Sequence, residues 1–393
     1  MSKILILNGS HSDIPLIKAA KKIGYHVITS GNRPDLIGHR YSDEYVPGDF
    51  SDIKKMCRVA EENKVDAICS CSNDFGAISA SYVAEKLGLP GHDPYETTLI
   101  LHHKDRFKQF ARENDIPTPL ADSYTEYKDA LEAIDRIKFP VMVKPIDLTG
   151  GKGVTKVESR EDYEAAVKKA FNMSPAGRIV VEPFIKGTHH SFSTFIINKK
   201  VAAYYSDNEY SFASPFLIST SAGPATSVEK VSDELIAVSE KIARILELRD
   251  GVFHIQYILS EDLRPYILEI TRRCSGDLYS LPVEHSTGIP WAEWIVRTEC
   301  GMSCNDFPRG ATQKIMGGRH CIIGDRNGEL KGIYISPEIE GNIYGDLLWW
   351  ENTRRIDNYL VDKVGIVLLE FDDREEMLHK VENIMNYIHP IYL

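Results

Sequence analysis

A paired-strand pattern between Gly251 and Asp277 constrains the fold of this chain more than any other stretch of its sequence. The segment GVFHIQYILSEDLRPYILEITRRCSGD consists of two apolar runs joined by the polar turn SEDLRP. Polar residues recur at every second position of both runs, and alternate residues of a strand point to opposite faces. The pattern therefore predicts a β-hairpin with one polar face and one apolar face that packs on helices.

The polar face of this hairpin holds a chemically mixed set of side chains. If the two runs pair, an amide, a carboxylate, a hydroxyl and a guanidinium share that face. Oxygen-rich groups of this kind bind hard cations, so the pattern indicates either a metal site or an ordinary hairpin with a solvated face. The residues are His254 and Gln256 on the first run and Glu269, Thr271 and Arg273 on the second.

Composition limits the class of protein. A chain of 393 residues is long enough for two or three domains. The formal net charge of −11 argues against a nucleic-acid surface, which needs a basic patch. The start MSKILILNGS has an apolar run too short for a signal peptide, and no run reaches membrane-spanning length. We therefore expect a cytoplasmic protein without a membrane or nucleic-acid partner.

The seven cysteines are scattered and contain no C-x-x-C pair. Their spacing indicates neither a disulfide framework nor a zinc site. Cys274 lies beside the hairpin, and we expect it to be a passive small residue because no partner base can be assigned to it.

The first part of the chain alternates short apolar runs with helical patterns. Strand patterns at KILIL, YHVITS and VDAICSCS are each separated by an amphipathic helical segment. This alternation predicts a doubly wound α/β domain with a parallel sheet. The segment after the first strand lacks the G-x-G-x-x-G fingerprint, which disfavours a nicotinamide-dependent oxidoreductase.

Two lysines stand out beyond the boundary marked by Pro90, Gly91 and Pro94. Lys104 lies near the start of the helical segment HHKDRFKQFAREND, where the helix dipole disfavours a positive charge. It is either an ordinary surface lysine or a ligand-binding one. Lys144 interrupts the apolar run VMVKPI, and it needs a partner or a bound anion because an unpaired buried charge is costly.

A glycine-rich turn, DLTGGKGV, follows Lys144 directly. Its glycines let the backbone approach a bound group and aim several N–H donors at it. The spacing does not match the G-x-x-x-x-G-K-S/T phosphate loop, so the turn is either a simple hairpin turn or a flexible cover for phosphates. The residues are Gly150, Gly151, Lys152 and Gly153.

The strand RIVVEPFIKG places Glu182 beside the apolar residues Phe184 and Ile185. A carboxylate next to an apolar backbone stretch can accept an amino group and hold a flat ring, although an ordinary strand end has the same pattern. His189 and His190 follow on the next strand. Adjacent strand residues face opposite ways, which argues against a two-histidine metal site.

Taken in order, these features resemble the ATP-grasp enzymes. The resemblance covers nearly the whole chain: an α/β domain, Lys104 before an I-P-T-P segment, VMVKPIDLTGGKGV, VVEPFIKGTHH and the hairpin ending in LEITRR. It is nearest to the branch with carbamoyl-phosphate synthetase, biotin carboxylase and glycinamide ribonucleotide synthetase. It implies an ATP-grasp fold of mixed α/β and α+β class with an N-terminal doubly wound domain. The implied parts are the N-terminal domain 1–95, an ATP-grasp region 96–310 with a lid at 139–190 and the metal hairpin 251–277, and an α+β cap at 311–393.

The resemblance also implies how ATP is bound. Lys104 and Lys144 resemble the two lysines that hold the α- and β-phosphates, and residues 150–153 resemble the mobile loop that closes on them. Glu182 with the backbone of residues 184–185 resembles the adenine-binding hinge.

Two histidines compete for the ribose. His189 falls where many members of the family have a ribose-binding glutamate, and His190 is the biotin carboxylase-like alternative. We favour His189 slightly.

The hairpin is similar to the family's magnesium site. Gln256 falls at the first metal ligand, usually glutamate but glutamine in carbamoyl-phosphate synthetase, and Glu269 matches the bridging second ligand. Thr271 replaces the usual asparagine, which puts the strength of the second metal site in question. Arg273 matches the arginine that contacts phosphate or the reacting acyl group.

This resemblance implies a carboxylate–amine ligase. A carboxylate attacks the γ-phosphate of ATP to give an acyl phosphate, and an amine then captures the acyl group. Mg²⁺ is the implied cofactor, with Mn²⁺ as an alternative, and relatives are often homodimers. Two other functions stay open: a relative that phosphorylates bicarbonate or another carboxylate, and a nucleotide-binding protein without turnover, for which Thr271 is the one hint.

The substrate positions are the least constrained part of the sequence. Segments rich in hydroxyls and short turns lie near the hairpin in sequence, and they supply the candidates for the acceptor site. These are Asn208, Glu209, Ser275, Gly276, Asp277 and Tyr279, with His254 and Arg272 as secondary candidates.

Overall fold

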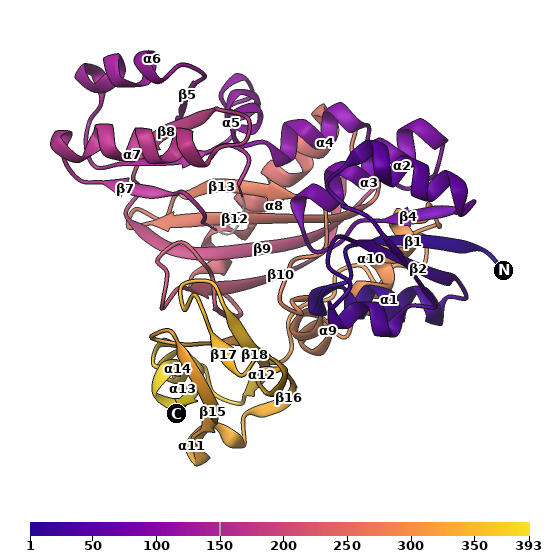
Figure 1. The fold of residues 1–393 in the computed structure, drawn as a ribbon. Coiled ribbons are helices and arrows are strands. Elements are labelled where there is room, and N and C mark those ends of the chain that lie inside the picture. Colours follow the sequence, from indigo (N-terminus) through magenta and orange to yellow (C-terminus); the bar gives the residue numbers. More distant parts are fainter. Residues whose placement is uncertain (149–150) are drawn as a thin grey trace.

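A central antiparallel sheet joins three other parts of the molecule in the computed structural model, which describes residues 1–148 and 151–393. In Figure 1 the N-terminal domain (indigo) lies to the right of the sheet, a small lid (purple and magenta) to its upper left, and the C-terminal segment (yellow) below it. The mixed α/β and α+β class and the ATP-grasp arrangement expected from the sequence are therefore present.

The N-terminal domain is built on a parallel sheet with the strand order β3-β2-β1-β4. Its elements are β1 (Lys3–Leu7), η1 (His11–Asp13), α1 (Ile14–Lys22), β2 (His26–Gly31), η2 (Ile37–Tyr41), β3 (Glu44–Pro47), α2 (Ile53–Glu62), β4 (Ala67–Cys69) and α3 (Asp74–Leu87). Alternate residues of β1 belong to different cores: Ile4 and Ile6 pack with α1, and Leu5 and Leu7 with α2 and α3. Helices thus cover both faces, which confirms the predicted doubly wound sheet.

The lid is a small antiparallel sheet of order β5-β8-β6-β7 with one long helix on it. Two helices precede it, α4 (Tyr95–His102) and α5 (Lys104–Glu113). Its elements are β5 (Asp122–Tyr124), α6 (Tyr127–Glu132), η3 (Ala133–Arg136), β6 (Val141–Pro145), β7 (Thr155–Val157), α7 (Arg160–Met173) and β8 (Ile179–Pro183). Because β5 pairs with β8, the lid sheet also includes a strand that lies before residues 139–190, the range expected for the lid from the sequence.

The central sheet has eight strands in the order β13-β12-β9-β10-β11-β14-β18-β16. Its first half comprises β9 (Gly187–Ile197), β10 (Lys200–Tyr210), β11 (Thr220–Gly223), β12 (Gly251–Ser260) and β13 (Pro265–Thr271), with α8 (Val228–Ile245) packed on it. Phe192 and Phe253 lie in one apolar cluster with Leu235 and Ile242 of α8, so the apolar face is covered by helix. The predicted hairpin is present as β12 and β13, and Gln256 is paired with Glu269 across it.

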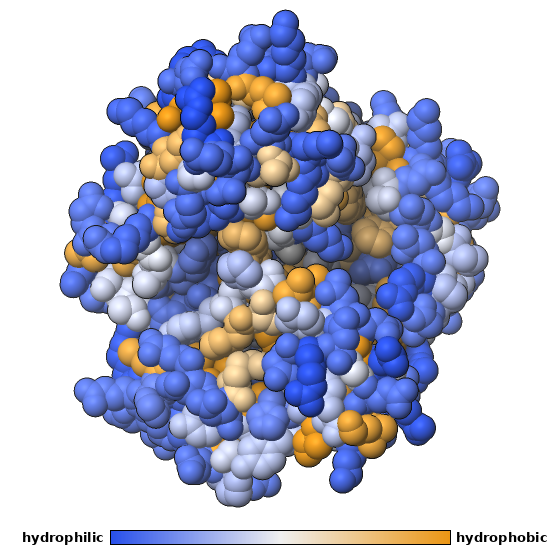
Figure 2. Space-filling view, turned by 60° about the vertical axis from the view of Figure 1, so that its left-hand side comes forward, coloured by the Kyte–Doolittle hydropathy of each residue, from blue (hydrophilic) through white to orange (hydrophobic). Residues whose placement is uncertain are grey.

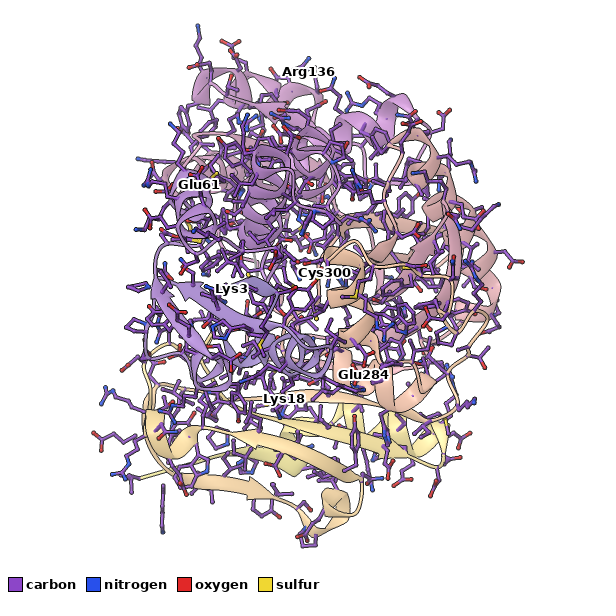
Figure 3. All side chains as sticks on the ribbon, turned by 90° about the vertical axis from the view of Figure 1, so that its right-hand side faces the viewer. Lys3, Lys18, Glu61, Arg136, Glu284 and Cys300 are labelled. Atoms are coloured by element: carbon purple, nitrogen blue, oxygen red, sulfur yellow. The ribbon has the colours of Figure 1, made fainter. Side chains whose placement is uncertain are left out.

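After β13 the chain passes from the central sheet to the N-terminal domain and then returns to the central sheet. Helices α9 (Ser280–Thr287) and α10 (Trp291–Glu299) follow β13, and α10 packs against α1. Figure 3 looks onto this side, with Glu284 on α9 and Cys300 just after α10 labelled. Cys300 belongs to the same buried cluster as Ile4 and Leu16, so this segment fastens the N-terminal domain to the sheet.

The C-terminal segment extends the central sheet and adds a second, three-stranded one of order β17-β15-β19. Strands β14 (Met316–Ile323), β16 (Ile343–Leu348) and β18 (Lys363–Phe371) complete the central sheet. The other elements are β15 (Gly328–Ile335), α11 (Pro337–Glu340), α12 (Trp350–Thr353), β17 (Arg355–Ile356), α13 (Arg374–Glu382), α14 (Ile384–Tyr387) and β19 (Ile388–Tyr392). Within the described part of the chain, no helix has the length and apolarity needed to cross a membrane.

Candidate active site

A cavity of about 770 Å³ lies where the lid, the polar face of the central sheet and the N-terminal domain meet. Figure 2 shows the molecule hollowed between an upper and a lower lobe. The cavity gathers most of the residues singled out from the sequence. Those that line it are Lys104, Lys144, Gly151, Glu182, Phe184, Ile185, His189, Gln256, Glu269, Thr271 and Arg273.

Other candidates lie elsewhere. Lys152 is exposed, and Gly153 packs against the ring of Pro145. His190 is buried and stacks on the ring of Tyr257, so only the first of the two histidines faces the cavity, as the two-residue period of a strand requires. Gly150 lies outside the described residues.

A row of polar side chains crosses four strands of the central sheet, and its members Gln256 and Glu269 line the cavity. Glu269 on β13 is opposite Gln256 on β12, which is opposite Ser191 on β9, which is opposite Asp207 on β10. Side chains opposite one another in a sheet point to the same face, so the four strands present a carboxylate, an amide, a hydroxyl and a second carboxylate in line. His254 and Thr271 form the next pair of the hairpin on that face.

Glu209 completes this polar row. The Gln256 Nε2 group donates to both of its oxygens, at 2.7 and 2.9 Å. Burial, reinforced by the nearby Asp207 carboxylate, raises the pKa of Glu209 to about 8. Since its amide nitrogen is turned to Glu209, Gln256 keeps its carbonyl oxygen as an acceptor. The hydroxyl of Thr271 is buried in the cavity wall without a hydrogen-bond partner among the described residues.

Glu182 does not stand free at the hinge. Its carboxylate is 2% exposed and forms ion pairs with Lys144 from β6 and, at 3.0 Å, with Lys108 from α5. Burial opposes the ionisation of Glu182, but the two ammonium groups outweigh it and lower its pKa to about 2. Burial lowers the pKa of Lys108 to about 8 against the attraction of Glu182.

The hinge end of the cavity has apolar walls suited to a flat ring. Met142 and Val180 of the lid sheet lie there with Ile258 and Leu268 of the hairpin. The N–H of Phe184 donates to the carbonyl of Pro140 at 3.0 Å, so this donor is already engaged. At the far side of the slot, the Lys104 ammonium donates to the carbonyl of Leu148 at 2.9 Å, which holds the start of α5 against the segment after β6.

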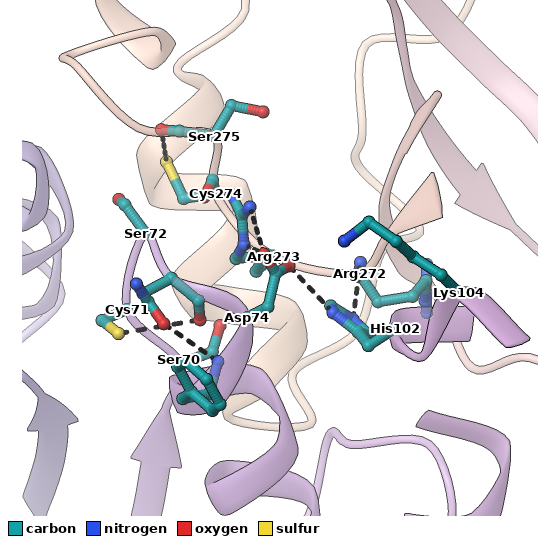
Figure 4. Close-up of polar contacts among 12 residues, drawn as sticks. Ser70, Cys71, Ser72, Asp74, His102, Lys104, Arg272, Arg273, Cys274 and Ser275 are labelled. Carbon is teal, nitrogen blue, oxygen red and sulfur yellow. Dashed lines mark hydrogen bonds and ion pairs between the residues drawn. The ribbon is translucent and has the colours of Figure 1, made fainter. Parts of the chain in front are cut away.

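Arg273 projects from just beyond β13 and meets the N-terminal domain. Its Nε and Nη2 atoms donate to the two carboxylate oxygens of Asp74, at 2.9 and 3.1 Å (Figure 4). Arg272 points away from the cavity: its guanidinium binds Asp93 at 2.8 Å and the carbonyl of Val252 at 2.5 Å. Of these two consecutive arginines, Arg273 therefore lies at the cavity and Arg272 binds groups outside it.

The end of the cavity opposite the hinge is walled by the C-terminal segment. Lys363 of β18 donates to Asp277 at 2.6 Å, and Arg319 of β14 lies 3.6 Å from the same carboxylate. His254 lies in this wall, and burial with the nearby guanidinium groups of Arg273 and Arg319 lowers its pKa to about 3, so its imidazole is neutral. Ser275, Gly276 and Tyr279 also line the cavity.

Sequence reasoning missed five charged residues of this cavity, one of them Lys156 of β7, and three of the five left a signal. Lys108 follows Lys104 by one helical turn within an apolar stripe. Asp74 follows β4 at the carboxyl end of the parallel sheet, where ligands bind. Arg319 interrupts an apolar strand as Lys144 does. Lys363 opens its strand and looks like an ordinary strand end.

Comparisons with known proteins fit this geometry. Residues 102–214 match the family described as "Phosphoribosylglycinamide synthetase, ATP-grasp (A) domain". The solved structure of an L-amino acid ligase from Bacillus licheniformis is similar over 100% of this chain and 99% of its own, with a TM-score of 0.83 and 20% identity. Residues 102–214 therefore match an ATP-grasp domain family, and the whole chain has the ATP-grasp fold.

Two further ATP-grasp structures superpose over the whole chain. A phosphoribosylglycinamide synthetase from Anaerococcus prevotii is 20% identical with a TM-score of 0.78, covering 100% of both chains. An N5-carboxyaminoimidazole ribonucleotide synthetase from Thermotoga maritima is 19% identical with a TM-score of 0.77, again covering 100% of both chains. At these identities the likeness establishes the ATP-grasp fold, and the reaction has to be argued from the cavity.

Proposed function

We propose that this ATP-grasp protein is an ATP-dependent carboxylate–amine ligase. The observation that carries the proposal is the layout of one cavity, in which an apolar slot at the hinge and a polar end in the C-terminal segment are joined by Gln256, Glu269 and Arg273. Similar structures are those of a synthetase and an L-amino acid ligase, which supports C–N bond formation as the reaction type.

Each part of the cavity has a role in this reaction. The slot between the lid sheet and the hairpin binds the adenine ring of ATP, with His189 beside the ribose. Lys104 and Lys144 bind phosphate oxygens, and the glycine turn from residue 151 covers them. Arg273 holds the reacting carboxylate against the γ-phosphate, because its planar donor fork matches both oxyanions.

The chemistry then proceeds in two displacements. A carboxylate oxygen attacks the γ-phosphorus, the bond to the β-bridging oxygen breaks, and ADP leaves with the electron pair. The amine attacks the carbonyl carbon of the acyl phosphate, the C–O bond breaks, and phosphate leaves with the carboxylate oxygen while the amine loses a proton. The protein positions the groups and supplies charge, and it needs no nucleophile of its own.

The residues present fit a magnesium ion held partly by phosphates. Gln256, Glu269 and Thr271 offer a carbonyl, a carboxylate and a hydroxyl oxygen, the hard donors that Mg²⁺ prefers. The unpartnered hydroxyl of Thr271 in the cavity wall is consistent with a role as ligand. Among the described residues, no group of three or more His, Cys, Asp and Glu could hold a metal ion, so the protein alone offers an incomplete shell. Bound Mg²⁺ would neutralise phosphate charge.

The proposal is tested by ADP and phosphate release from Mg·ATP across a panel of carboxylates, each with and without amines. We expect release that needs one particular carboxylate and one particular amine. Parallel fluorescence titrations with ATP and NADH provide a check on the nucleotide. Tighter binding of NADH than of ATP would contradict the proposal.

A further inference from the structure

The Asp74–Arg273 pair leaves a defined part of the guanidinium available to a ligand. Arg273 has five N–H donors. Contacts among the described residues engage three: Nε and one Nη2 hydrogen by Asp74, and one Nη1 hydrogen by the carbonyl of Cys274 at 3.0 Å. The two that remain sit one on each terminal nitrogen, the pair that can bind two oxygens of a carboxylate or phosphoryl group.

Asp74 is itself fixed from two sides. It is the first residue of α3, directly after the N-cap Asn73. The Asp74 carboxylate also accepts from Nδ1 of His102 at 3.0 Å, and the side chain of His102 is fully buried. Because Nε2 of His102 accepts from the backbone N–H of Arg272 at 3.2 Å, the imidazole proton lies on Nδ1 and is donated to Asp74. Figure 4 shows these contacts together.

These contacts make the orientation of Arg273 depend on a domain that does not carry it. Asp74 comes from the N-terminal domain, His102 from the end of α4 and Arg273 from the end of the hairpin. Without Asp74, the guanidinium could rotate about the bonds of its long side chain, and its free donor pair would lose its direction.

We infer that Asp74 is a positioning residue: its carboxylate holds the Nε–Nη2 edge of Arg273 so that the remaining donors on the two terminal nitrogens face the phosphoryl group undergoing transfer. This inference rests on the proposed function for the identity of the oxyanion. It makes the N-terminal domain part of the active site, acting through Arg273 rather than by touching the substrate.

The neighbouring residue pair supplies a matched control. Asp93 and Arg272 form a similar ion pair that is more deeply buried, with Nε and Oδ2 2.8 Å apart; their side chains are 4% and 8% exposed, against 16% and 13% for Asp74 and Arg273. Arg272 donates through Nη1 and Nη2 to the backbone carbonyls of Val252 and Arg249, outside the cavity. Asp93→Asn therefore removes a buried carboxylate from the neighbouring ion pair and should leave the orientation of the Arg273 guanidinium unchanged.

The deciding experiment is calorimetric binding of inorganic phosphate to the full chain saturated with Mg·ADP. We expect Asp74→Asn to weaken phosphate binding by about 10-fold or more, the size of effect seen when a group that orients a ligand-binding residue is removed. Asp93→Asn should stay within about 2-fold of the wild type, because neither Asp93 nor Arg272 lines the cavity in which phosphate binds. Urea unfolding of both variants shows that they are compared as folded proteins.

Each outcome decides a different question. The inference about Asp74 would be overturned, and the proposed function left standing, by either of two results. One is equally weakened phosphate binding in the two variants, and the other is wild-type protein that binds ADP but not phosphate. Wild-type protein that does not bind ADP would instead contradict the proposed function. A second readout is coupling: with Arg273→Lys already in place, Asp74→Asn should cause little additional loss, whereas a purely structural Asp74 would cause its full loss again.

Discussion

Removing the Glu182 carboxylate should destabilise the protein strongly. The Glu182 side chain is 2% exposed and neutralises two lysines that are themselves 5% and 15% exposed. A pKa that falls from the usual 4.5 to about 2 corresponds to about 3 kcal/mol of stabilisation at neutral pH. Glu182→Gln leaves two buried ammonium groups facing each other, so we expect the free energy of unfolding to fall by about 3 kcal/mol.

Two further variants separate the charge effect from lost packing. Lys108→Met leaves a one-to-one pair of Glu182 and Lys144, and it removes a cation whose burial lowers its pKa to about 8, so it should cost less than about 1 kcal/mol. Adding Lys108→Met to Glu182→Gln should restore part of the loss, because one buried positive charge is then removed. Glu261→Gln is the surface control: Glu261 pairs with Lys186, but the side chains are 73% and 80% exposed, which predicts a change within about 0.5 kcal/mol.

The measurement is urea unfolding followed by circular dichroism at neutral pH and below. The pKa of Glu182 is lowered by folding, so its stabilisation is present above pH 4.5 and is lost as pH falls towards about 2. The difference between wild type and Glu182→Gln should shrink through that window. A Glu182→Gln variant as stable as Glu261→Gln at neutral pH, or a difference that does not change with pH, would refute the reasoning.

Three other outcomes follow from the structure. Glu269→Ala should abolish Mg-dependent ADP release and change the free energy of unfolding by less than about 1 kcal/mol, since the side chain faces the cavity; retained activity would remove Glu269 from the metal set. Burial lowers the pKa of His320 to about 3, so the unfolded chain binds a proton at this histidine before the folded chain does, and the free energy of unfolding should fall as pH drops below about 6.5. His320→Gln should flatten the dependence of that free energy on pH by about one proton. An unchanged slope would contradict a neutral buried imidazole. A Cβ at Gly318 would lie 1.8 Å from the Ser221 carbonyl oxygen, so Gly318→Ala should lower the free energy of unfolding by about 2 kcal/mol. Gly341→Ala should leave it unchanged, because a Cβ there meets nothing; equal free energies for the two variants would mean that the two strands can separate without cost.

Local patterns predicted the parts of the molecule whose geometry is set locally. The two-residue period of the hairpin placed Gln256 and Glu269 on one face, and the structure pairs them. The same period separated His189 from His190, and the structure places His189 at the cavity and His190 in the interior. Strand residues follow such a rule because the pleat fixes where each side chain points.

Local sequence patterns did not predict the contacts between distant segments. Glu182 was expected to be open to a ligand, yet it is shared by lysines 74 and 38 residues earlier in the chain. The partner of Arg273, Asp74, lies 199 residues away, and no local period links the two. The pairing of Lys363 with Asp277 likewise depends on how β18 docks beside β14 in the central sheet. Charge partners of this kind are fixed by tertiary packing.

The most direct test of the central claim follows one oxygen atom. With a carboxylate and an amine that together support ADP release, the carboxylate is labelled with ¹⁸O and the released phosphate is analysed by mass spectrometry. Transfer through an acyl phosphate leaves one carboxylate oxygen on the phosphate, so we predict one ¹⁸O in each phosphate released. Phosphate that carries no label would mean that water, rather than the carboxylate, attacks the γ-phosphate, and would contradict the assignment of a carboxylate–amine ligase.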